Sequence, residues 1–153
     1  REAYSLQLEG EGSRFPTEVI DFSETQFADE AGWVLEWNPA ELEQSILGDV
    51  RLYINSQHGR VKDAVSTTGD IGFDIRETIR FDVARTLIYG ALENQHFVDN
   101  PEHYEDGSVG AAVFSMLRLY FPQDTLSDLR TRIQQPQAFE PQLQAKLRIF
   151  RNS

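Results

Sequence analysis

The richest group of side chains that could do chemistry lies between residues 96 and 106. Two imidazoles, His96 and His103, stand there with the carboxylates of Asp99, Glu102 and Glu105. Nitrogen and oxygen ligands of these kinds can hold Zn, Mn or Fe ions. Crowded carboxylates can also acquire separate pKa values, as an acid–base pair requires. These five residues are therefore candidate ligands of a metal-binding site or a metal-dependent enzyme.

The spacing of this segment favours a different interpretation. It matches no helical metal motif such as His-Glu-x-x-His, and Pro101 interrupts any continuous helix across it. The segment is more typical of a solvated acidic loop between two helices, with Asp106 and Gly107 forming a turn. Loops carry function disproportionately, so the metal hypothesis stays open.

Other catalytic signatures are absent from the sequence. The chain has no Cys, which excludes disulfides, thiolate zinc sites and a cysteine nucleophile. It contains no Walker sequence, no Gly-x-Gly-x-x-Gly and no Gly-x-Ser-x-Gly. The sequence therefore predicts no cofactor and favours a protein that is not an enzyme.

The charge of the chain bears on its partners. With 25 acidic and 14 basic residues, the net charge is −11. Such a surface repels nucleic-acid phosphates and anionic membranes alike. No segment approaches the roughly 20 apolar residues of a membrane span, and no secretory signal is visible. We therefore expect a cytoplasmic location and a protein partner or homo-oligomer, without direct nucleic-acid binding.

Aromatic side chains provide a second candidate site. Phe73 and Phe81 fall away from the apolar stripe of one expected helix, and Phe114 falls off the inner face of another. Exposed aromatic residues that group on a surface mark partner sites. The alternative is a helix buried on two sides. We therefore predict a non-enzymatic protein–protein interaction or assembly module of a larger complex, with these three residues as interaction candidates.

The elements that position these residues follow from a change of hydrophobic period near residue 70. Before it, apolar residues tend to alternate, as in a strand, and after it they recur every three or four residues, as in a helix. We expect strands at 4–8, 18–22 and 33–37, a short helix from Asn38 to Gly48, and a hairpin of 49–55 with 60–65.

Three helices are expected after this point. The first spans about 71–96, capped by Asp70, with an inward stripe from Ile71 to Leu92 and with Gly90 packed closely against a neighbour. The second follows Ser108 and the third follows Asp124. Residues 142–149 alternate strictly, which favours a strand, although Leu143 and Leu147 also fit a helix.

These expectations define one α+β domain over residues 1–153. A mostly antiparallel sheet of four to six strands is packed on one face by three C-terminal helices. The strand expected at 142–149 would return to the sheet and close the core. The chain begins at Arg1 without an initiator Met, which indicates a domain cut from a longer protein or a processed product.

Overall fold

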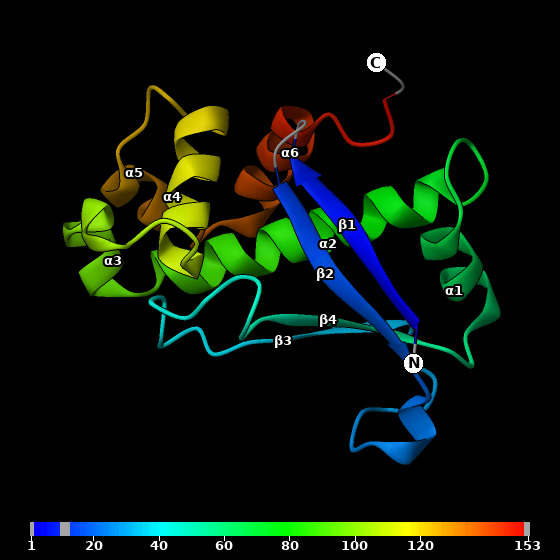
Figure 1. Cartoon of the computed structure of the whole chain (residues 1–153). Helices are drawn as coiled ribbons and strands as arrows, with labels where there is room; N and C mark the ends of the chain where they lie inside the picture. The colour runs from blue at the N-terminus through cyan, green and yellow to red at the C-terminus, as the bar shows by residue number, and fades with distance from the viewer. Residues whose placement is uncertain (1, 10–12, 152–153) are drawn as a thin grey trace.

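A sheet followed by helices makes up the chain (Figure 1). The computed structural model describes residues 2–9 and 13–151, with side chains from Phe15 onward. Its strands are β1 (Glu2–Glu9), β2 (Ser13–Ile20), β3 (Trp33–Glu36) and β4 (Arg51–Asn55). Its α-helices are α1 (Gly59–Ser66), α2 (Phe73–Leu92), α3 (Gln95–Asp99), α4 (Val109–Tyr120), α5 (Leu126–Arg132) and α6 (Pro136–Leu147). The 3-10 helices are η1 (Phe22–Glu24) and η2 (Pro101–His103). The predicted α+β class is confirmed.

The four strands form one mixed sheet in the order β1-β2-β4-β3. The β1–β2 and β3–β4 pairs are antiparallel, whereas β2 and β4 are parallel, with Thr17 opposite Leu52. The parallel pair arises because β3 comes between β2 and β4 in sequence but pairs on the outer side of β4. As a result, the carboxyl ends of β2 and β4 meet at one edge of the sheet.

The burial of alternate residues shows that the helices cover one face of the sheet. Leu52 and Ile54 of β4 are buried, while Tyr53 between them is half-buried on the opposite face. On that outer face Tyr53 meets the ring of Phe27, 5.7 Å between centroids. Helix α2 crosses the sheet behind β1 and β2 in Figure 1. The predicted sheet with helices packed against it is observed, but the sheet is mixed and six α-helices follow it in the described residues, not three.

The expected hairpin of 49–55 with 60–65 is wrong in its second half. Residues 59–66 form α1, which buries Val61 and Ala64. A spacing of three residues suits one face of a helix, so the two side chains pack together without a partner strand. The helix lies against Gly72, where a Cβ would stand 2.5 Å from the Cα of Ala64.

Helix α2 confirms most of the predicted stripe and corrects its ends. Ile79, Val83, Ala84, Leu87, Ile88, Ala91 and Leu92 are buried. The N-cap residue is Gly72 at φ 76, not Asp70, and Ile71 before it is 75% exposed. A Cβ on Gly90 would stand 2.5 Å from Trp37, which confirms the close approach predicted there.

The helix expected from Asn38 to Gly48 is not formed. The segment makes turns and runs beside the start of α4, where the amides of Val109 and Gly110 donate to the carbonyls of Gln44 and Leu42. These hydrogen bonds satisfy amides that a helix N-terminus leaves free. Ser108 caps α4 as predicted, whereas Thr125, not Asp124, caps α5.

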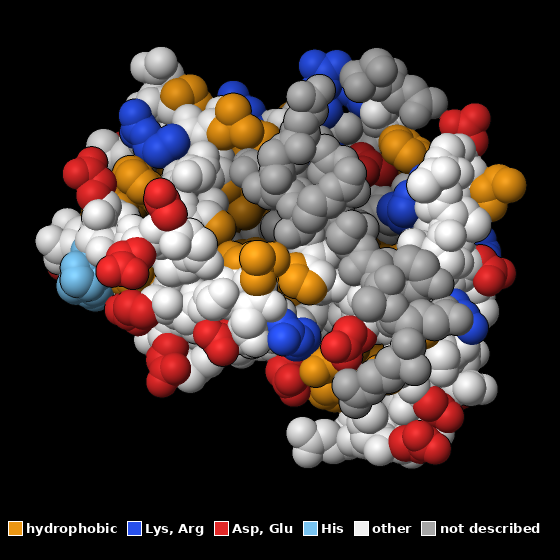
Figure 2. Space-filling view, in the orientation of Figure 1, with side chains coloured by type: hydrophobic (Ala, Val, Ile, Leu, Met, Phe, Trp, Pro, Cys, Tyr) orange, Lys and Arg blue, Asp and Glu red, His pale blue; other side chains and the backbone are white. Residues whose placement is uncertain are grey.

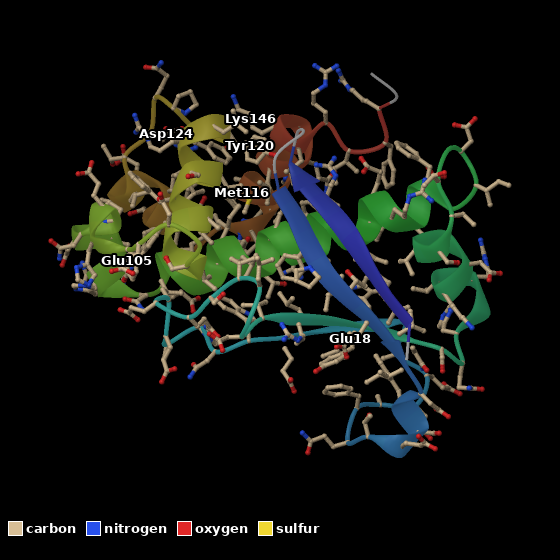
Figure 3. All side chains as sticks on the ribbon, viewed as in Figure 1. Glu18, Glu105, Met116, Tyr120, Asp124 and Lys146 are labelled. Atoms are coloured by element: carbon tan, nitrogen blue, oxygen red, sulfur yellow. The ribbon has the colours of Figure 1, made fainter. Side chains whose placement is uncertain are left out.

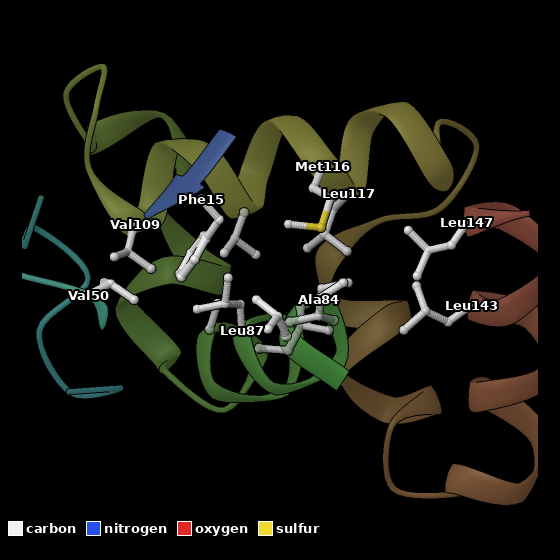
Figure 4. Packing of buried hydrophobic residues seen from close by; sticks show 14 of the residues in the cluster. Phe15, Val50, Ala84, Leu87, Val109, Met116, Leu117, Leu143 and Leu147 are labelled. Carbon is white, nitrogen blue, oxygen red and sulfur yellow. The ribbon is translucent and has the colours of Figure 1, made fainter. Parts of the chain in front are cut away.

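The strand expected at 142–149 is wrong, because α6 continues to Leu147. Phe139, Leu143 and Leu147 recur every four residues and are all buried, and Figure 4 shows Leu143 and Leu147 facing the core that contains Met116 and Leu117. Helices α3 and α6 therefore add to the three that were expected. No helix in the described ranges is long and apolar enough to cross a membrane.

Candidate functional site

The segment with the candidate metal ligands folds around α3 and η2. The exposed rings of His96 and His103 meet edge to face, 5.0 Å between centroids, and each also adjoins the ring of Tyr104. Asp99 accepts a hydrogen bond from the side chain of Gln95. Figure 2 shows the His side chains with Asp and Glu side chains around them, and Glu105 is labelled at this end in Figure 3.

The structure thus brings two of the five predicted ligands together. Among the residues it describes, no group of three or more His, Cys, Asp or Glu side chains is placed to hold a metal ion. Asp99, Glu102 and Glu105 do not join the two imidazoles in such a group. The metal site stays a prediction.

Tyr104 shows that this segment is packed against the helices, unlike a freely solvated loop. Its side chain is 8% exposed and fills the space that a Cβ on Gly110 would occupy. Burial raises the pKa of Tyr104, and the charge of Glu43 adds to this effect. The absence of a side chain at Gly110, near the start of α4, therefore leaves room for the ring of Tyr104.

The three interaction candidates differ in their surroundings. Phe81 and Phe114 are half-buried and pack against the hydrophobic core. Phe73 is half-buried at the start of α2 and lies outside that core cluster.

A polar clamp ties the C-terminal segment to α2. Glu77 and Arg80 form a bidentate ion pair with contacts of 2.8 and 2.9 Å, and each side chain is only 13% exposed. Arg80 also donates to the carbonyl of Leu147, and Glu77 accepts from the amide of Phe150. Phe73 and Glu77 are four residues apart on α2 and so share a helix face. The clamp therefore holds the backbone of Phe150 against Glu77, one helical turn after Phe73.

Three apolar side chains belong to the two segments that this clamp joins, the start of α2 and the C-terminal segment. Ile71 is 75% exposed, Phe150 is 54% exposed, and Phe73 is half-buried. We call these three residues the Phe150 surface. Phe150 adopts φ 65, a left-handed conformation that bulky residues rarely take, and Arg148 before it has φ 55. Such backbone persists only where surrounding contacts impose it, as the clamp does here.

Sequence patterns alone did not reveal Ile71 or Phe150 as surface residues. Ile71 continues the spacing of the buried stripe, and Phe150 continues the spacing of Leu143 and Leu147. Gly72, with its left-handed conformation, is the local signal that the helix begins after Ile71.

A second polar group joins α2 to α6. The hydroxyl of Tyr89 donates to Glu140 at 3.0 Å, and the ring of Tyr89 meets Phe139 edge to face. Burial, followed by the hydrogen bond and the charge of Glu140, raises the pKa of Tyr89 to about 12. Because the folded-state pKa is raised, Tyr89 stabilises the fold below about pH 10, and this contribution is lost as the pH rises toward 12.

In an absorbance titration at 295 nm, Tyr89 is therefore expected to ionise at a higher pH than an ordinary tyrosine. Replacing Glu140 with Gln should lower the pKa of Tyr89 but leave it above the ordinary value of about 10, because burial remains. The Tyr89→Phe variant should remove one late-titrating group. If its titration curve matches that of the parent chain, the assignment to Tyr89 is wrong.

Two open pockets lie at the edge where β2 and β4 end. One, of about 430 Å³, is lined among others by Asp21, Glu24 and Lys62. The other, of about 640 Å³, lies at the start of α1, where the lining includes His58, Arg60, Asp29 and Glu30. Ligands in open sheets often bind beyond the carboxyl ends of parallel strands. Both pockets carry charges of both signs, so their chemistry favours neither an anion nor a cation.

Comparison with protein-family models, with curated proteins and with solved structures finds no match to this chain. The function of the chain must therefore be inferred from its own geometry.

Proposed function

We propose that this protein is an assembly module that binds another protein chain through the Phe150 surface. The observation that carries the proposal is the exposure of Ile71 and Phe150, 75% and 54%, next to a clamp that holds the backbone of Phe150 in place. Apolar side chains held in a fixed position lose little conformational freedom on binding, so their burial favours association.

Two further features support this function. The sequence has no catalytic signature, and its net charge of −11 opposes binding to nucleic acid or to anionic lipid. The Glu77–Arg80 pair, which binds the backbone of Phe150, also has side chains that are only 13% exposed. Aromatic residues that sit on such a rigid base are the usual anchors of protein interfaces.

Site-specific photocrosslinking in the cells that make the protein tests this function. A benzophenone side chain placed at residue 71 or 150 is expected to form a crosslinked protein product. Placed at Leu47 or Leu119, which are 69% and 61% exposed, it serves as a matched control.

The comparison of these positions decides the outcome. Products from 71 and 150 but not from 47 and 119 would support the proposal. Equal yields from all four positions, or no product from 71 and 150, would overturn it, because the Phe150 surface would then contact no partner specifically.

A further inference from the structure

We infer that the partner of the Phe150 surface is a second copy of this chain, an inference that rests on the function proposed above. The two sides of the surface carry opposite charges. Asp70 and Asp74 are exposed at the start of α2, and Arg148 and Arg151 are exposed on the C-terminal segment. None of the four side chains forms an ion pair with another described residue.

Residues of one charge sign flank the apolar residues of each segment. Ile71 and Phe73 lie between the two acidic residues in sequence, and Phe150 lies between the two arginines. The amide of Phe150 donates to Glu77, one helical turn after Phe73, which joins the acidic side to the basic side.

Such a surface is complementary to itself. In a two-fold interface the same patch faces its copy, so residue i contacts residue j and residue j contacts residue i. The two aspartates of one copy then meet the two arginines of the other, twice, around a shared apolar centre. A partner whose contacting residues were all acidic or all basic would instead place like charges against one side of the surface. Contacts between like charges disfavour binding.

Light scattering on a sizing column, over a tenfold range of protein concentration at 150 mM salt, tests this inference. The whole chain should approach twice its monomer mass of 17.5 kDa as the concentration rises. Phe150→Ser should raise the dissociation constant at least about tenfold. Leu119→Ser, which changes an equally exposed residue on α4, should leave the mass unchanged.

Charge reversal makes the test specific to the geometry. Asp74→Arg alone and Arg151→Glu alone should each weaken self-association at least about tenfold. An equimolar mixture of these two variants should associate again, because every contact between unlike variants then joins opposite charges. Thermal melting of each variant at low concentration would verify that it is folded.

The outcomes separate this inference from the proposed function. A chain that stays monomeric, or a mixture that fails to associate when both variants are folded, overturns the second copy as the partner. Crosslinking from residues 71 and 150 to a different protein would also overturn the second copy, but it would support the assembly function.

Discussion

Replacing Phe139 with Ala is expected to lower the free energy of unfolding by about 3–5 kcal/mol. Phe139 is fully buried in α6, stacked on Phe121 at 5.6 Å and packed edge to face on Tyr89 at 5.8 Å between ring centroids. Removal of the ring leaves a cavity where α2, α4 and α6 meet, and rigid helices collapse into it only in part. Chemical denaturation followed by circular dichroism measures the loss.

The Leu119→Ala variant is the control for this prediction. Leu119 lies on the outer face of α4 and is 61% exposed, so its truncation should change the free energy of unfolding by less than about 0.5 kcal/mol. A loss below about 1 kcal/mol for Phe139→Ala would contradict the packing of α6 against α2 and α4.

The second large effect is expected at Asn55, where Asn55→Asp should cost about 3–5 kcal/mol at pH 7. The side chain is 1% exposed; its oxygen accepts from the amides of Phe22 and Gln57, and its nitrogen donates to the carbonyls of Asp29 and Ala31. A carboxylate would turn the two donated bonds into contacts between oxygens. This residue ties the loop of residues 21–31 to the end of β4.

The loss at Asn55→Asp should depend on pH. Burial raises the pKa of such a carboxyl in the folded state, so the variant is least destabilised where the carboxyl is protonated and can donate one hydrogen bond. Denaturation at pH 4 and pH 7 should therefore give the smaller loss at pH 4. Gln57→Glu makes the same chemical change at an exposed neighbour and should cost less than about 0.5 kcal/mol at either pH. Equal losses for both variants would refute the role assigned to Asn55.

The parts of the fold that sequence patterns predict are those with a long, unambiguous period. The buried stripe of α2 extends over several helical turns, and no strand of ordinary length would show the same spacing of apolar residues. Residues 142–149 are short enough that periods of two and four both fit. Phe139, one helical turn before Leu143, is the residue that distinguishes the helix from the strand.

The candidate sites depended on contacts that no local pattern contains. The rings of His96 and His103 meet because the chain turns after α3 and places His103 at the end of η2, which residue types alone do not specify. The position of Phe150 depends on a hydrogen bond to Glu77, 73 residues away in sequence. The sequence could therefore predict that some aromatic residues are exposed, but it could not predict which of them reach the surface.

The parallel pairing of β2 with β4 has a consequence for the order in which the protein folds. The β1–β2 pair joins neighbours in sequence, whereas the bond between the Phe22 amide and Asn55 closes a loop of 33 residues. Loop closure costs entropy before the contacts that it permits can form. The junction of β2 and β4 is therefore expected to form after the β1–β2 pair, and β2 would keep one edge unpaired until β4 has been synthesised.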